Sequence, residues 1–104
     1  MRVARGSELT ACWEQGRRLR TAHLDLAWRP SPAAFARTGV VVPRFHHSAV
    51  SRNRLRRRLR EILRRHVQHG LPAVDLVVRA KHAAYAASFA ALRAELADAA
   101  SRLA

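Results

Sequence analysis

The sequence predicts an α+β fold, in which helices pack on a small mixed sheet. Three short apolar segments bounded by turn residues indicate strands, and three other segments repeat apolar residues at the spacing of a helix. Their order along the chain is α-β-β-α-β-α. A chain of 104 residues has room for one hydrophobic core, so we expect residues 1–104 to form a single domain.

The first helix is expected directly after residues 1–6, which we predict to be a flexible basic tail. Ser7 is a plausible N-cap, and Gly16 follows the last turn. Between them, apolar residues recur at the i, i+3 and i+4 spacing of one helix face: Leu9, Cys12 and Trp13. The arginines that come next are expected to form a basic turn: Arg17, Arg18 and Arg20.

Strands are predicted at three places. Residues 23–30 alternate between large apolar and smaller side chains, which indicates a half-buried strand. Residues 38–45 form the second strand, and Pro43 limits how far its hydrogen-bond ladder runs. Residues 73–80 form the third strand. If the second and third strands are parallel, the general rule makes the crossover between them right-handed.

The central helix carries the main signal of function. Residues 51–65, SRNRLRRRLREILRR, hold eight arginines and one glutamate. Ser51 can cap this helix, Val50 and Leu55 occupy the staple positions around that cap, and Gly70 with Pro72 ends the helical segment. On a helical wheel the apolar residues form one narrow stripe that faces the core: Leu55, Leu59, Ile62 and Leu63. The remaining surface of the helix is cationic.

The last helix is expected to begin after the cap residue Ser88. Its apolar stripe consists of Phe89, Leu92, Leu96, Ala99 or Ala100, and Leu103.

The net charge of +13 indicates a polyanionic partner. Nucleic acid is the first candidate for this partner, and an anionic membrane is the second. Lys81 is the single lysine among twenty basic residues. Arginine binds phosphate with a planar fork, although drift in a GC-rich genome would also favour arginine. The lone Cys12 excludes an internal disulfide, and no run approaches the roughly 20 apolar residues of a membrane span. We therefore expect a cytoplasmic protein.

The clustering of arginines has a cost that a partner would remove. Like charges at i,i+4 destabilise an exposed helix by about 0.2–0.5 kcal/mol per pair, and phosphates would convert this repulsion into attraction. Asn53, between Arg52 and Arg54, has two open interpretations. Its amide either hydrogen-bonds a ribose or base edge beside phosphate-bound arginines, or it stabilises the first helical turn.

Three blocks in this region resemble the protein component of bacterial ribonuclease P: GVVVPR from Gly39 to Arg44, AVSRNRLRR from Ala49 to Arg57, and the Arg60-Glu61 pair. That family carries an RNR motif, here Arg52 to Arg54, and the resemblance extends over nearly the whole chain. It implies a left-handed βαβ crossover, against the general rule. It also implies a catalytic RNA subunit that removes the 5′ leader from precursor tRNA, while the protein binds the RNA subunit and the leader.

The resemblance also implies the site residues. The positions expected to bind RNA are Arg44, Arg52, Asn53, Arg54, Arg56, Arg57, Arg60 and Arg64. The candidates for a cleft that holds the leader are Leu9, Trp13, Ala27, Val41 and Phe45. The expected partners are the RNA subunit and precursor tRNA. Mg²⁺ is expected to bind through the RNA subunit, with no catalytic residue and no metal ligand in the protein.

This chain departs from the family pattern at Pro43-Arg44-Phe45, where Ser-Lys-Lys is usual. His46 and His47 stand where an apolar residue and a glycine are common. Leu9 occupies a position that is commonly Phe, and Ala27 one that is often Tyr, so Trp13 is expected to be the main aromatic residue of the cleft. A tryptophan on the apolar face of a helix also fits a core position, so both roles stay open at this point.

Other functions are weaker alternatives. Six histidines are present, but neither Cys12 nor the seven acidic residues supply a third ligand at zinc spacing. A general RNA-binding or ribosomal-type protein would share the basic charge, because phosphate contacts carry no sequence information. A membrane-surface helix is disfavoured because the apolar stripe of the arginine helix is narrow and is needed for the core.

Overall fold

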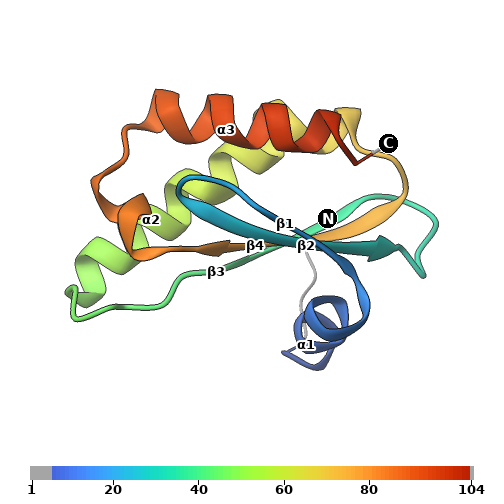
Figure 1. The fold of residues 1–104 in the computed structure, drawn as a ribbon, viewed down its shortest axis with the longest axis horizontal. Coiled ribbons are helices and arrows are strands. Elements are labelled where there is room, and N and C mark those ends of the chain that lie inside the picture. Colours follow the sequence, from blue (N-terminus) through green and yellow to red (C-terminus); the bar gives the residue numbers. More distant parts are fainter. Residues whose placement is uncertain (1–5, 104) are drawn as a thin grey trace.

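The computed structural model describes residues 6–103 and confirms the α+β class. A four-stranded mixed sheet forms the centre of the molecule, in the order β1-β2-β4-β3 (Figure 1). The strands are β1 (Arg17–Arg20), β2 (Leu24–Pro30), β3 (Arg37–Val41) and β4 (Val74–Ala80). β2 pairs with β1 and β4 in antiparallel fashion, and β3 pairs with β4 in parallel.

The predicted element order lacked β1, which was expected to be a turn. β1 forms an antiparallel hairpin with β2, in which Arg17 pairs with Trp28 and Arg20 with Asp25. The strand was missed because three of its four residues are arginines and the connecting residues 21–23 contain no glycine or asparagine. As an edge strand, β1 keeps its charged side chains in solvent, which protects the sheet edge from pairing with other chains.

Helices cover both faces of the sheet (Figure 1). α2 (Ala49–Ile62) and α3 (Phe89–Ser101) lie on one face, and α1 (Gly6–Gln15) lies on the other. α2 continues through a π-helical segment, Leu63–Val67, and a short 3-10 turn, Gln68–Gly70, and a second 3-10 turn, His82–Ala86, follows β4. Among residues 6–103, no helix is long and apolar enough to cross a membrane.

The core has two parts, one on each face of the sheet. The larger part lies beneath α2 and α3 and includes the predicted stripe of α2: Leu55, Leu59, Ile62 and Leu63. In α3, Leu92, Leu96 and Ala99 are buried as predicted, and so is Leu103 just after the helix, whereas Phe89 is exposed. The smaller part lies beneath α1 and consists of Cys12, Ala27 and Val77, with Leu9, Trp13 and Val41 packed around them.

Helix caps correct two predictions. Ser48, and not Ser51, is the N-cap of α2, because its side chain accepts a hydrogen bond of 3.1 Å from the backbone N–H of Ser51. Val50 is consequently exposed and does not act as a staple residue. α1 already includes Gly6, so Ser7 lies in its first turn rather than at its cap. The prediction for Ser88 is confirmed, and the rest of the predicted basic tail lies outside the described residues.

The parallel pairing of β3 and β4 makes the segment through α2 a crossover connection. Its left-handed sense stays a prediction of the family resemblance. The pairing has a direct structural consequence, because the carboxyl ends of the two strands lie at the same edge of the sheet. The segments that follow Val41 and Ala80 therefore start side by side. At the opposite edge, the segments that lead into Arg37 and Val74 end side by side.

A glutamate in α3 fixes the hairpin of β1 and β2. The Glu95 carboxylate accepts hydrogen bonds from the backbone N–H of His23 at 3.0 Å and from the Thr21 hydroxyl, and its other oxygen lies 2.7 Å from His23 Nδ1. Burial disfavours the charged carboxylate, but the hydrogen bonds from Thr21 and His23 outweigh it, and the pKa of Glu95 lies below its usual value. The charged form of Glu95 therefore stabilises the fold.

Glu95→Gln is expected to lower the free energy of unfolding at neutral pH by about 1.5 kcal/mol, because hydrogen bonds to a charged group are lost. Since the folded pKa is lowered, this stabilisation is complete above the usual glutamate pKa and disappears as the pH falls through the folded value. Urea unfolding of both proteins from neutral pH down to about pH 3 measures the difference. A difference that stays constant over this range would contradict the assignment.

Candidate nucleic-acid interface

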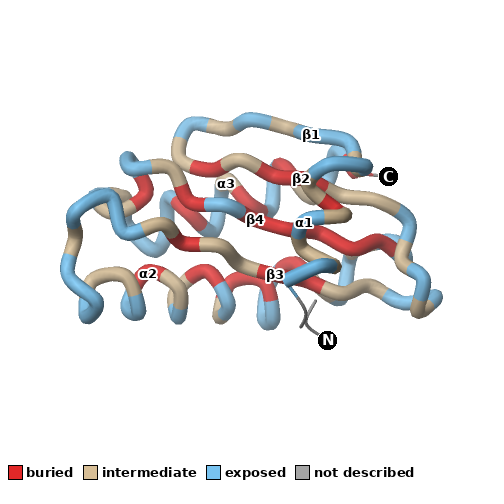
Figure 2. The backbone as a smooth tube through the Cα atoms, turned by 90° about the horizontal axis from the view of Figure 1, so that it is seen from below, coloured by how far each residue is buried: buried red, intermediate tan, exposed pale blue. Residues whose placement is uncertain are grey.

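α2 presents a row of arginines on the side that faces away from the sheet. The buried residues of α2 face the core, and the outer side of the helix is exposed along its length (Figure 2). We call the following residues the α2 arginine surface: Arg54, Arg56, Arg57, Arg60 and Arg64. Arg56 is half-buried and the others are exposed. Because the apolar stripe fixes the rotation of the helix, these cationic groups are ordered on one folded surface.

The first turn of α2 is tied to the end of β3. Arg52 Nε donates a hydrogen bond of 2.8 Å to the carbonyl oxygen of Val42, so this half-buried arginine has a structural role in addition to its charge. Asn53 and Arg54 are exposed on the same turn. The RNR motif therefore combines one anchored arginine with two side chains that point into solvent.

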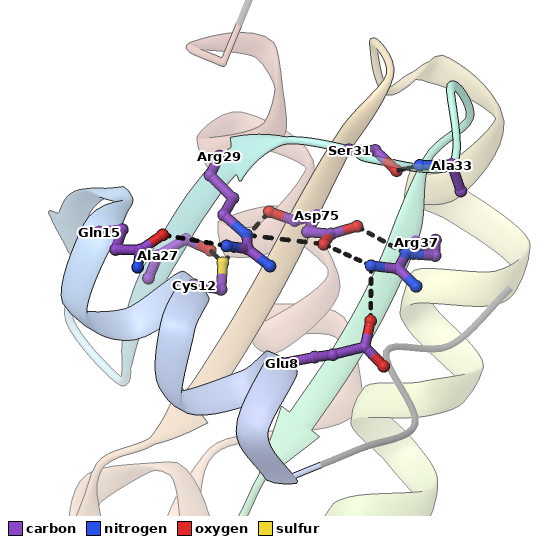
Figure 3. A network of polar contacts seen from close by, with 9 residues as sticks. All are labelled: Glu8, Cys12, Gln15, Ala27, Arg29, Ser31, Ala33, Arg37 and Asp75. Carbon is purple, nitrogen blue, oxygen red and sulfur yellow. Dashed lines mark hydrogen bonds and ion pairs between the residues drawn. The ribbon is translucent and has the colours of Figure 1, made fainter.

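On the other face, a buried carboxylate holds α1 to the sheet (Figure 3). Asp75 in β4 is 0% exposed and accepts two hydrogen bonds from Arg37 of β3, at 2.8 and 2.7 Å. Arg37 Nη2 also lies 2.8 Å from Glu8 of α1. The hydrogen bonds from Arg37 to Asp75 raise the pKa of Arg37, so the guanidinium stays charged. We call Glu8, Arg29, Arg37 and Asp75 the Asp75 cluster.

Arg29 completes the Asp75 cluster at a longer range. Its Nε lies 3.8 Å from Asp75, which allows charge attraction but no hydrogen bond, and its Nη1 donates to the Gln15 side chain at 3.2 Å. Two positive charges thus surround one buried negative charge. A buried carboxylate is tolerated only with such pairing, because an isolated charge costs several kcal/mol to remove from water.

The contact of α1 with the sheet also requires a small thiol and a glycine. The Cys12 thiol lies 3.5 Å from the carbonyl oxygens of both Ala27 and Asp75, and burial raises its pKa, so it stays protonated. At Gly16, a Cβ atom would lie 2.5 Å from the carbonyl oxygens of Cys12 and Trp28. Glycine therefore permits the close approach of the end of α1 to β2.

Trp13 lies at the edge of the α1 contact and is half-buried. Two guanidinium groups lie over its ring, with the Cζ atoms of Arg18 and Arg79 at 5.1 and 5.9 Å from the ring centroid. Arg18 also donates two hydrogen bonds to the Trp13 carbonyl oxygen, at 3.0 and 2.7 Å. Arg79 is exposed and pairs in register with Val41. We call Trp13, Arg18, Val41 and Arg79 the Trp13 surface.

A cluster of rings lies where β3 and β4 end. His47 stacks on Tyr85 with ring centroids 3.8 Å apart and an interplanar angle of 2°. His82 lies 5.3 Å from His47 and 5.6 Å from Phe45 by ring centroids. The Tyr85 hydroxyl donates to the Pro43 carbonyl oxygen at 2.6 Å. We call Phe45, His47, His82 and Tyr85 the ring cluster.

The ring cluster rests on a strained turn. Phe45 and His46 have φ values of 48° and 70°, in the left-handed region that non-glycine residues rarely adopt. This conformation leaves Phe45 39% exposed and places it just before the N-terminus of α2. Strain of this kind persists only where surrounding contacts hold it, and it often marks a functional segment.

The structure brings the sequence-predicted candidates together only in part. Trp13 and Val41 lie on one surface, with Leu9 packed next to them beneath α1. Ala27 is fully buried against Cys12 and Val77, so it supports this surface from below and has no exposed area of its own. Phe45 belongs to the ring cluster, four residues beyond Val41, and Arg44 is exposed beside it.

Several residues of these surfaces were missed by sequence reasoning. Arg18 was expected in a turn and Arg79 in a strand. Neither residue was expected to contact the Trp13 ring. Recognition of β1 would have revealed the position of Arg18, because a second strand places it across from Ala27. No sequence signal connects His47 with Tyr85 or Asp75 with Arg37, because these pairs are distant along the chain.

The domain is small, has a net charge of +13, and carries an ordered arginine surface on one helix and arginines around a tryptophan. These features place it in the class of nucleic-acid-binding domains. Comparisons with known proteins narrow this class. A family model described as Ribonuclease P matches residues 1–104. The chain therefore belongs to the Ribonuclease P family.

Two relatives illustrate the similarity in sequence. The ribonuclease P protein component of Desulfovibrio desulfuricans is 43% identical over 100 residues, which cover 92% of this chain and 77% of that protein. That of Thermus scotoductus is 45% identical over 82 residues, which cover 79% of this chain and 48% of that protein. The match thus covers about half the length of the Thermus relative.

Two solved structures share the fold. The ribonuclease P protein of Thermotoga maritima superimposes with a TM-score of 0.88 at 25% identity, covering 99% of this chain and 100% of that one. That of Staphylococcus aureus gives a TM-score of 0.85 over 98% of this chain and 95% of that one, and its 18% identity supports the fold alone. A ribonuclease P protein component has an RNA subunit as its partner.

Asp75→Ala is expected to lower the free energy of unfolding by about 3–5 kcal/mol, because Arg37 and Arg29 lose their buried counter-charge. The matched control is Asp98→Ala, which removes a carboxylate 66% exposed that pairs with Arg102 at 3.0 Å. An exposed pair of this kind contributes about 0–1 kcal/mol. Chemical unfolding of both variants measures the contrast, and equal losses would argue against a central role of the Asp75 cluster.

Proposed function

We propose that the chain is the RNA-binding subunit through which a bacterial ribonuclease P binds both its RNA subunit and precursor tRNA during removal of the 5′ leader. The α2 arginine surface carries this proposal. It concentrates cationic groups on a helix whose core packing fixes their direction, and phosphates would relieve their mutual repulsion. Such a complex would act in the cytoplasm.

The two RNAs would occupy different sides of the domain. The RNA subunit would bind along the α2 arginine surface and at Asn53, where arginine forks can meet phosphates in pairs. The leader would lie across the Trp13 surface on the opposite face of the sheet. A single strand suits this surface, because an aromatic ring offers a platform for a base and the neighbouring arginines attract the backbone.

The ring cluster would extend the path of the leader. Val41 and Arg79 of the Trp13 surface are paired in register, and Phe45 and His82 follow four and three residues later at the same edge of the sheet. A single-stranded RNA leader that passes Trp13 in this direction would reach Phe45 and Arg44 next. Phe45 would then provide a second platform where the family pattern has a lysine.

The cleavage chemistry would reside in the RNA subunit. Within residues 6–103, no three His, Cys, Asp or Glu side chains gather in a way that could hold a metal ion. In this proposal, Mg²⁺ would bind through phosphates of the RNA subunit and supply the charge stabilisation for cleavage. The role of this chain would be to bind, orient and screen the phosphates of two RNAs that repel each other.

Reconstitution tests the proposal. The purified chain is added to a bacterial ribonuclease P RNA and a precursor tRNA with a short leader, at a magnesium concentration too low for the RNA alone. We expect accurate 5′ processing only when protein and RNA are both present. If the protein does not change processing, a general RNA-binding role becomes the better interpretation.

The joint change of Arg52, Asn53 and Arg54 to Ala is expected to weaken binding of the RNA subunit. The slope of log affinity against log salt should fall by about two, one for each phosphate contact that is lost. Filter binding over a salt series measures this slope, and thermal unfolding verifies the fold, because Arg52 also bonds Val42.

The matched control for the triple alanine variant of the RNR motif, which we call the RNR variant, changes two exposed arginines elsewhere to Ala. They are Arg17 of β1 and Arg93 of α3. This double variant has the same net charge as the RNR variant and is expected to keep nearly the full affinity. If both variants lose the same affinity, binding depends on net charge rather than on the α2 surface, and the proposed interface is wrong.

Trp13→Ala is expected to reduce the affinity of the holoenzyme for precursor tRNA about five-fold or more, the value of one stacked base. Its affinity for mature tRNA, which has no leader, should not change. Trp13→Phe should retain most of the binding because it keeps a ring at this position. Equal losses with precursor and mature tRNA would indicate a purely structural role for Trp13.

A further inference from the structure

A hollow of about 580 Å³ lies at the edge of the sheet opposite the ring cluster. One wall is the turn between β2 and β3, and the other is formed by the end of the α2 segment and the residues that precede β4. The lining residues are Ala34, Phe35, Ala36, Arg64, Gln68, His69, Leu71 and Ala73. We call this site the Phe35 hollow.

The Phe35 hollow is built from constrained backbone. Ala34 has a φ of 61°, a left-handed conformation that costs energy for a residue with a Cβ atom. Gln68 Nε2 donates a hydrogen bond of 3.3 Å to the Ala36 carbonyl oxygen and so connects the two walls. The second wall includes the π-helical segment Leu63–Val67, and such segments occur often at functional sites. Both walls are therefore held in conformations that their sequences do not favour.

The composition of the hollow suits a nucleobase. Ala36, Leu71 and Ala73 supply apolar lining, and Phe35 supplies an aromatic ring that is 45% exposed. Arg64 and His69 add groups that can bond to base edges or phosphate. A ring platform with a cationic rim is the arrangement that binds single-stranded bases without strong sequence preference.

The position of Arg64 indicates which RNA supplies the base. Arg64 is the last residue of the α2 arginine surface and also lines the hollow, so the two sites are continuous. Arg64 Nη2 lies 3.3 Å from both carboxylate oxygens of Glu61, and its side chain is 67% exposed. Such an exposed pair is weak, so a phosphate can replace Glu61 as the partner of Arg64.

We propose that the Phe35 hollow receives one unpaired nucleobase of the RNA subunit, stacked on Phe35, while Arg64 binds the adjoining phosphate. This inference rests on the proposed function of α2 as the surface that binds the RNA subunit. In the proposed arrangement, the leader would lie across the Trp13 surface on the other face of the sheet, away from the hollow. The hollow thus extends the RNA-subunit interface beyond the RNR motif to the far end of the crossover.

The test measures affinity for the ribonuclease P RNA subunit with Phe35→Ala, Phe35→Trp and Phe89→Ala. Phe89 is the matched control, an exposed phenylalanine on α3 with 37% exposure. Phe35→Ala should weaken binding about five-fold or more, with an unchanged salt slope, because stacking releases no counterions. Phe35→Trp should keep the affinity. Arg64→Ala should lower the slope by about one.

Chemical modification of the RNA identifies the occupant. A nucleobase of the RNA subunit should be protected by the wild-type protein and by Phe89→Ala, and should become reactive with Phe35→Ala. The proposal is overturned if Phe35→Ala binds the RNA subunit as well as Phe89→Ala does. It is also overturned if the loss appears only with precursor tRNA that carries a leader. If the wild-type protein itself does not bind the RNA subunit, the proposed function fails instead.

Discussion

The buried Asp75 carboxylate is the interaction on which the two-sided arrangement of the domain depends. It joins β4 to β3 through Arg37, and Arg37 in turn joins β3 to Glu8 of α1. The apolar contact of α1 with the sheet is small and consists of Leu9, Cys12 and Trp13. An apolar contact of that size would not fix its direction. The ion pair of Glu8 with Arg37 does, because the bidentate pair with Asp75 holds the Arg37 guanidinium in place. The position of Trp13 beside Arg79 therefore follows from a charge buried on the same face.

Arginine serves three different purposes in this chain. Arg37 neutralises a buried charge, and Arg18 combines a hydrogen bond to the Trp13 carbonyl with a contact to its ring. On α2, arginines such as Arg54 and Arg57 are exposed to solvent. The folded core separates these purposes, because the apolar stripe of α2 and the register of β4 decide which side chains reach solvent. In the proposed function, two basic surfaces on opposite faces of one sheet would allow a small domain to contact two RNAs at once.

Local patterns predicted the elements that depend on local physics. The apolar stripe of α2 and the cap at Ser88 follow from helical spacing and from a hydroxyl before a helix, and both are confirmed. Ser48 was missed because Ser51 is an equally good cap by type, and only the path of the chain after the strained turn at Phe45 selects between them. The Asp75 cluster, the ring cluster and the Phe35 hollow depend on the pairing of β3 with β4, which no local pattern determines.

The central claim, that two RNAs bind on opposite faces, can be tested by cleavage from a tethered iron chelate. Cys12, the one native cysteine, is fully buried, so a chelate attaches selectively to an added thiol. One holoenzyme carries Glu14→Cys on α1, and another carries Arg65→Cys in the π-helical segment that continues α2. Both positions are exposed. Hydroxyl radicals should cut the precursor leader from the first position and the RNA subunit from the second. Cleavage of the same RNA from both positions, or of the leader from the α2 side, would contradict this arrangement.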